Sequence, residues 1–149
     1  MKGKIEMNKF MILAAVAAIG LAVQAGEHDT PQTSGDFVQL VAGEKVYAGN
    51  IAIVGTNGLA YAANTTAVVG GTVCGVFQYS AAAGEKVLAK RGGFILENAT
   101  SGTVEKADIG ATVYSVSNNA WTVTKTSGGK TVGKVADVRD DGVVVVVGR

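Results

Sequence analysis

The chain has 149 residues, enough for one ordinary domain with a core and an arm, and a formal net charge of +1 at pH 7. A balance so close to neutral creates no general field for nucleic acid or an anionic membrane, so we expect neither as a partner. Hydrophobic residues make up 48% and aromatic residues 6%, with 21 glycines, so the apolar content is mainly valine and alanine. This composition favours thin, valine-rich strands joined by glycine turns.

Residues 1–25 form an apolar N-terminal arm. A polar, basic start precedes an uninterrupted apolar run at 10–23, which is too short to span a bilayer comfortably. Such a start, with a small-residue site ending at Ala25, is typical of a secretory signal peptide. The other interpretation, which we prefer, is a retained alanine-rich helix that packs against a partner protein, since alanine, leucine and methionine are strong helix formers. The polar segment 26–35 holds the only proline and is expected to link this arm to a domain over 36–149.

Beyond the linker, short apolar runs alternate with small-residue turns, which is the period-two pattern of half-buried strands. The string AGEKV occurs twice, at 42–46 and 83–87. The predicted strands are 37–40, 45–47, 51–54, 60–62, 72–79, 85–90, 93–96, 112–117, 120–124, 133–138 and 143–147. One helical turn fits within 104–110. The pattern predicts an all-β fold, either a small barrel or a β-tulip-like sandwich of short strands.

Two details of this pattern make specific predictions. The pairs Asn57-Gly58 and Asp141-Gly142 favour the primed turns of tight hairpins, in which positive φ is needed. Five consecutive valines at 143–147 are apolar on both faces, so this strand should be covered on both sides.

No constellation for catalysis or metal binding stands out. His28 and Cys74 are the only residues of their kinds and lie far apart in the sequence, which argues against nucleophilic catalysis and a zinc site. Cys74 lies among valines and is interpreted as a small core residue. The carboxylates of Asp137, Asp140 and Asp141 surround a hairpin turn and lack the spacing of a calcium loop. We therefore expect no enzymatic activity, no cofactor and no metal.

A few side chains are candidates for contact with a partner. Lys86, Lys90 and Arg91 form a basic patch, typical of a solvated strand face and also suited to an acidic surface. Trp121, the only tryptophan, fits either the core or rim of its hairpin or an interface anchor. The candidate contacts are Phe10, Met11, Ile12, Leu13, Ile19, Leu21, Pro31, Lys90, Arg91 and Trp121.

From about residue 29 to the end, the order of short phrases resembles the head decoration, or capsid cement, proteins of tailed bacteriophages. The phrases are DTP at 29–31 with GD at 35–36, AGEKVYAG at 42–49, VCGVF at 73–77, AGEKV at 83–87, RGGF at 91–94, ADIGATVY at 107–114, VGKVADV at 132–138 and DGV at 141–143. They follow one another in the order typical of that family. The apolar stretch 10–23 is not part of the common pattern.

The resemblance implies a compact β-barrel or β-tulip-like domain on the outer surface of a phage head. Such a domain clamps neighbouring copies of the major capsid protein and has no enzymatic activity. Valine-rich strands without a disulfide would leave apolar surface for neighbours to cover, so we expect a homo-oligomer, with a trimer as the first choice. The alternative is a secreted or surface-exposed bacterial β domain that loses residues 1–25 and binds a glycan or a protein.

Overall fold

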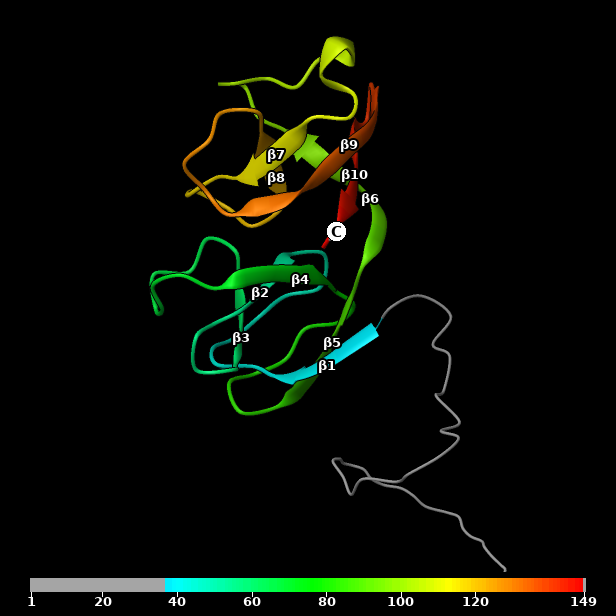
Figure 1. Cartoon of the computed structure of the whole chain (residues 1–149). Helices are drawn as coiled ribbons and strands as arrows, with labels where there is room; N and C mark the ends of the chain where they lie inside the picture. The colour runs from blue at the N-terminus through cyan, green and yellow to red at the C-terminus, as the bar shows by residue number, and fades with distance from the viewer. Residues whose placement is uncertain (1–36, 149) are drawn as a thin grey trace, which may run out of the picture. The chain divides into compact units, whose positions relative to one another are not determined.

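The computed structural model describes residues 37–148. This part of the chain is all-β, with one single-turn 3-10 helix (Figure 1). Its elements are β1 (Phe37–Val41), β2 (Ile51–Val54), β3 (Ala60–Ala62), β4 (Thr72–Phe77), β5 (Lys86–Lys90), β6 (Gly92–Asn98), η1 (Lys106–Asp108), β7 (Thr112–Ser115), β8 (Thr122–Thr124), β9 (Thr131–Arg139) and β10 (Gly142–Val147). The predicted arm and linker, residues 1–35, lie outside the described residues.

Strands β1 to β5 form an antiparallel sheet in the order β1-β5-β4-β2-β3. The sheet curls until its two ends touch: Ala42, directly after β1, bridges Ala60 in β3, and the Gly43 N–H donates to the Ala60 carbonyl oxygen at 2.8 Å. Small side chains permit this tight curl, because they leave room for the strands to close on one another. The inner core consists of Ala42, Val46, Ala52, Ala60, Phe77, Ala81, Val87 and Ala89.

The other five strands form a closed barrel in the order β10-β6-β8-β7-β9 (Figure 1). Only the β6–β8 pair is parallel. Along β10, Val143, Val145 and Val147 are fully buried, whereas Val144 and Val146 point outward and are only partly buried. The prediction that both faces of this strand are covered therefore holds fully for the inner face and only in part for the outer face, where Val144 and Val146 keep some exposed surface.

The two halves share one large core. Ile51 and Ile53 of β2 pack with the buried valines of the barrel, while Ala52 between them faces the inside of the curled sheet. Successive side chains point to opposite faces of a strand, so β2 is buried on both sides and reads as a continuous apolar run. Arg91 alone separates β5 from β6, so the chain passes from the sheet to the barrel in a single residue.

Every predicted strand except 45–47 corresponds to an observed one. Val46 makes only an isolated bridge to Ala81, because the chain turns directly after it: the Asn50 N–H donates to the Tyr47 carbonyl oxygen at 3.2 Å. The single helical turn predicted within 104–110 is confirmed as η1, in which Glu105 is the N-cap residue and its N–H donates to the Asp108 carboxylate.

The β2–β3 hairpin forms at Asn57-Gly58, but its turn is not the predicted primed type. The Gly55 N–H donates to the Leu59 carbonyl oxygen, and the Gly58 N–H donates back to the Gly55 carbonyl oxygen, both at 2.9 Å. This closes a three-residue loop in which Gly58 has φ +81°. Three-residue hairpin loops commonly place glycine at this left-handed position.

The β9–β10 hairpin also forms, with its turn one residue earlier than predicted. Gly142 pairs with Arg139, so Asp140 and Asp141 form the loop and Gly142 begins the strand, at φ +144°. A Cβ atom at Gly142 would collide with the Leu96 carbonyl oxygen of β6. Close approach of β6, as well as the backbone conformation, therefore requires glycine here.

Candidate attachment surfaces

Three of the predicted contact residues lie in the described part of the chain. Lys90 ends β5 and Arg91 joins it to β6, whereas Trp121 precedes β8 and contacts Glu97 near the other end of β6. The structure therefore brings Lys90 and Arg91 together and separates Trp121 from them. The remaining candidates, Phe10, Met11, Ile12, Leu13, Ile19, Leu21 and Pro31, lie outside the described residues.

Trp121 lies on the rim of the barrel and not in its core. Its side chain is 48% exposed, and its indole N–H donates to Glu97 Oε1 at 2.7 Å. The Thr122 hydroxyl donates to the same carboxylate oxygen at 3.2 Å. One edge of the indole is thus fixed while its apolar face stays accessible, an arrangement suited to an interface anchor.

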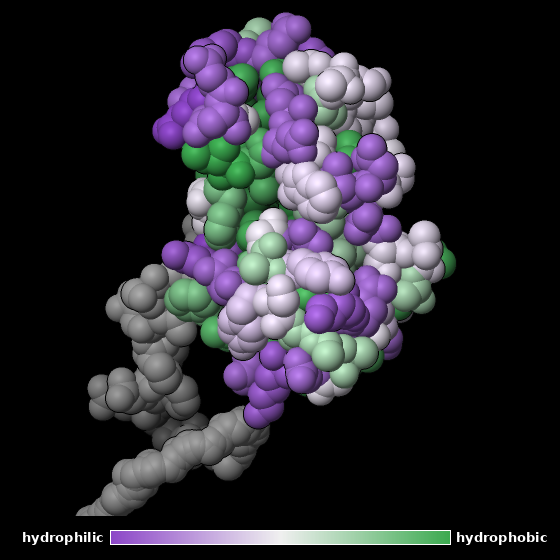
Figure 2. All heavy atoms as spheres, turned by 180° about the vertical axis from the view of Figure 1, so that it is seen from behind, coloured by the Kyte–Doolittle hydropathy of each residue, from purple (hydrophilic) through white to green (hydrophobic). Residues whose placement is uncertain are grey.

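An apolar strip follows the outside of β6 and β10 from Trp121. Ile95, which is 46% exposed, lies directly opposite Val144, and Val146 lies opposite Gly93. Figure 2 shows hydrophobic surface gathered over the barrel half of the domain. We call Ile95, Val144, Val146 and Trp121 the barrel strip. Its side chains face outward because their neighbours in sequence fill the barrel.

A second mixed surface covers the outer face of β1 and β5. Phe37, Gln39 and Val41 lie opposite Lys90, Leu88 and Lys86, respectively, and opposed residues share a face. We call these six residues the β1–β5 face. Lys90 Nζ lies 5.6 Å from the centre of the Phe37 ring, within range of a cation–π contact. Two lysines of the predicted basic patch therefore share a surface with exposed apolar side chains.

Arg91 supports the junction between the two halves. A Cβ atom at Gly148 would lie 2.6 Å from Arg91 Cγ, so the aliphatic stem packs directly on the C-terminal backbone. The Nε atom is buried and has no hydrogen-bond partner within residues 37–148. The packing of the Arg91 stem on the C-terminal backbone therefore explains an arginine between β5 and β6, whether or not Arg91 also contacts a partner.

Cys74 packs against the inner core of the curled sheet, with Sγ 3.5 Å from the Ala52 carbonyl oxygen. Burial raises the pKa of the Cys74 thiol to about 11, and the nearby charge of Arg91 opposes this rise. The thiol is therefore protonated at neutral pH and is a poor nucleophile. The interpretation of Cys74 as a small core residue is therefore correct only in part, since Cys74 is partly buried and packs against the core from its edge.

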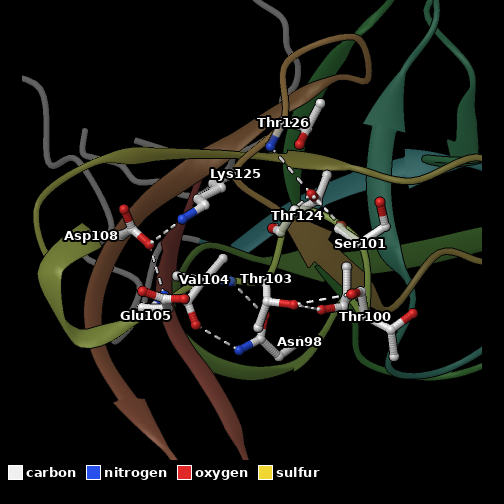
Figure 3. A network of polar contacts seen from close by, with 12 residues as sticks. Asn98, Thr100, Ser101, Thr103, Val104, Glu105, Asp108, Thr124, Lys125 and Thr126 are labelled. Carbon is white, nitrogen blue, oxygen red and sulfur yellow. Dashed lines mark hydrogen bonds and ion pairs between the residues drawn. The ribbon is translucent and has the colours of Figure 1, made fainter.

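A polar network braces the loop between β6 and η1 (Figure 3). The Asn98 side-chain amide brackets Val104: it donates to the Val104 carbonyl oxygen at 2.8 Å and accepts from the Val104 N–H at 2.9 Å. Asp108 Oδ2 accepts from the Glu105 N–H at 2.7 Å and lies 3.5 Å from Lys125 Nζ. These polar groups are engaged in holding the loop, so the network supports the local structure.

The carboxylate of Asp137 ties η1 and β9 together. It accepts from its neighbour's N–H, that of Val138, at 2.9 Å and lies 3.2 Å from both Lys106 Nζ and Arg139 Nε. These hydrogen bonds, the backbone one first, hold the pKa of Asp137 below its usual range. The predicted acidic cluster is therefore a solvated hairpin turn. Asp140 and Asp141 lie in its loop, and Asp137 is paired with Lys106 and Arg139.

Within 37–148, no group of three or more His, Cys, Asp or Glu side chains is arranged to hold a metal ion. One hollow between 63–66 and 115–117 is lined largely by small polar side chains, with Lys130 at its edge. No helix in the described part of the chain has the length and apolarity needed to cross a membrane.

Sequence reasoning did not identify Phe37, Val41 or Ile95 as contact residues. The period-two alternation shows which residues share a face of one strand, but solvent exposure depends on which strands pair. Comparisons of the chain with models of known protein families, with curated proteins and with solved structures found no significant match.

Proposed function

We propose that this chain is a structural virion protein that decorates the outer surface of a phage head and stabilises it by bridging neighbouring major capsid subunits. The observation that carries the proposal is where the family-like phrases fall in the fold. AGEKVYAG at 42–49 spans the closure of the curled sheet, RGGF at 91–94 is the crossing into the barrel, and DGV at 141–143 is the last hairpin. These segments lie where one strand is connected to the next, and such connections determine the order of the strands. Their occurrence in the same order as in the decoration proteins therefore supports the same architecture.

The physical character of the domain also suits this role. A bridging protein needs a rigid scaffold with more than one contact surface and requires no reaction centre. The shared core of the two halves supplies the scaffold. The barrel strip and the β1–β5 face lie on different strands of different halves, so one copy has separate surfaces for two neighbours.

The arm is proposed to anchor the domain through the linker at 26–35. Its apolar run, residues 10–23, would gain several kcal/mol from burial of even a few hundred Å² at roughly 25 cal/mol per Å², before the cost of ordering is subtracted. We propose that residues 10–23 are retained and pack against a neighbouring chain of the shell, and that the decorating unit is a homo-oligomer, with a trimer as the first choice.

Sedimentation of heads that lack this protein, mixed with the purified full-length chain, tests the proposal. We expect the chain to pellet with the heads until its sites are filled, and heads that already carry it to take up none. Deletion of residues 1–25 should leave the β domain folded and weaken its attachment. Protein that stays in the supernatant at saturating head concentration would contradict the proposed function.

The mass of the natural protein separates this proposal from the secreted alternative, which the signal-like features ending at Ala25 favour. Retention predicts an intact mass that includes the apolar run. A natural protein that begins at Gly26 would instead show a removed signal peptide and favour a secreted domain that binds a glycan or a protein.

A further inference from the structure

Within the described residues, strand β1 is an edge strand that lacks the usual protection. Natural sheets discourage edge-to-edge pairing with lysine, proline, bulges or very short edge strands. The β1 sequence, FVQLV, has no charge and no proline, and its ladder with β5 runs without a register shift over five residues. The opposite edge, β3, has only three residues, and the segment after β1 bridges it.

The free hydrogen-bonding groups of β1 belong to its odd-numbered residues. The Ala42 N–H donates to the Glu85 carbonyl oxygen, toward β5, whereas the Gly43 N–H donates to Ala60 on the other side, both at 2.8 Å. Backbone groups alternate between the two sides of a strand, so residues 38 and 40 face β5 and residues 37, 39 and 41 face outward. Within residues 37–148, β1 pairs with β5 alone.

The pattern of β1 is complementary to itself. In an antiparallel pair centred on Gln39, each Phe37 would lie opposite Val41 of the second copy, a favourable aromatic and β-branched pair. The two Gln39 side chains would meet at the centre, where each amide supplies both a donor and an acceptor. No like charges would lie directly opposite, because the lysines of β5 would be about three strand spacings, roughly 14 Å, from those of the partner.

We propose that the outer edge of β1 is a self-association site, at which two copies of this chain pair β1 to β1 in antiparallel register about Gln39. The two curled sheets then join into one continuous ladder across a two-fold axis. A contact of five residues a side is small for a stable dimer, so the pairing is weak in dilute solution and is favoured where copies are concentrated. It does not rest on the proposed function, because it is a property of the free chain, and it is a different contact from the one that would form the proposed trimer, since a two-fold contact pairs two copies and does not close a three-fold ring.

Disulfide trapping in the full-length chain tests the register. In a Cys74→Ala background, Gln39→Cys places two thiols on paired Cα atoms about 5.5 Å apart, within disulfide range. The matched control is Lys86→Cys, exposed on β5 and too far from its counterpart to bridge. We expect a covalent dimer from Gln39→Cys on oxidation at about 100 µM protein, where a weak contact is populated, and none from Lys86→Cys. Equal cross-linking at both positions, or none at position 39, would overturn the proposal.

A second pair of variants tests the hydrogen bonds. Gln39→Pro removes an N–H that faces outward and leaves the β1–β5 ladder intact, whereas Gln39→Thr keeps it. Sedimentation velocity of the full-length proteins should show self-association at least about tenfold weaker for Gln39→Pro, with Gln39→Thr close to the parent. Circular dichroism checks that both variants are folded. Association of a folded Gln39→Pro protein at the parental level would also overturn the proposal.

Discussion

The barrel half and the sheet half each contain five strands, but the hydrogen bonding between strands is closed in the barrel and open at one side of the sheet. In the barrel every strand has a partner on each side, so no edge is open. Within residues 37–148, the curled sheet closes only at Ala42 and Gly43, and the outer edge of β1 before them pairs with no other strand. The two halves therefore have different roles within one small domain. The closed barrel contributes stability without exposing a strand edge, and the incompletely closed sheet presents backbone hydrogen-bonding groups for association.

The shared core explains why such a division is possible. Ile51 and Ile53 belong to the sheet by hydrogen bonding and to the barrel by packing. An open edge is tolerated on a sheet whose other face is buried against a closed barrel, because the barrel holds the strands in place even when no partner is bound.

The largest loss of stability is expected from a substitution that fills the narrow space between β9 and β10. In Gly133→Ala, the new methyl group would collide with the Val146 carbonyl oxygen, a backbone atom that cannot rotate away. We expect a loss of about 4 kcal/mol in the free energy of unfolding, or no folded protein. Gly93→Ala is the matched control, since a Cβ atom there meets nothing within 4 Å. Urea unfolding measures both, and equal effects would contradict the close β9–β10 approach.

A slightly smaller effect is expected in the core that joins the halves. Ile53→Ala removes a fully buried side chain from the shared cluster and should cost about 3 kcal/mol. Because both halves use that cluster, sheet and barrel should still unfold in one transition at a lower midpoint. Val69→Ala, at an almost fully exposed position, is the control and should change little. Two separate transitions for Ile53→Ala would show that the halves are independent domains.

A change on the barrel strip should affect attachment more than stability. Trp121→Ala removes an exposed ring whose indole contacts Glu97, so the fold should lose about 1 kcal/mol or less. If the strip faces the shell, binding to heads should weaken about tenfold or more, and Trp121→Phe should retain part of the affinity. Head sedimentation measures this, and unchanged binding of Trp121→Ala would exclude the strip as the contact.

The smallest expected effect is on the pH dependence of the thermal midpoint. The pKa of Asp137 is lowered in the folded state, so its stabilising contribution is present above the ordinary pKa of an unfolded Asp, about 3.9, and is lost as the pH falls through the folded value. Asp137→Asn should therefore lower the thermal midpoint slightly at pH 7, and the difference from the parent should shrink as the pH falls below about 3.9. Asp140→Asn, in the exposed loop, is the control. A difference that persists in acid would mean that the charge is not its cause.

Much of the fold could be predicted from the sequence because valine alternation and glycine turns mark strand positions locally. The failure at 45–47 shows the limit, since Val46 has the residue type of a strand but lacks a continuous ladder partner. The Asn57-Gly58 pair predicted a hairpin but not its loop length, which depends on the pairing of Gly55 with Leu59.

The candidate surfaces could be predicted only in part. Lys90 and Trp121 stand out by residue type, but Phe37 joins Lys90 only through a pairing between strands about fifty positions apart. Likewise, five valines in a row do not tell which of them face outward until β10 takes its place between β6 and β9. Which side chains are exposed depends on how the strands pair in the folded domain, so a local sequence pattern cannot predict it.

Electron cryomicroscopy of heads prepared with and without this protein tests the central claim most directly. The proposed function predicts additional density on the outer surface of the shell, where neighbouring major capsid subunits meet, of a size that fits the two-lobed β domain. Heads that look the same in both preparations, when the protein is present in excess, would contradict the claim that this chain decorates a capsid.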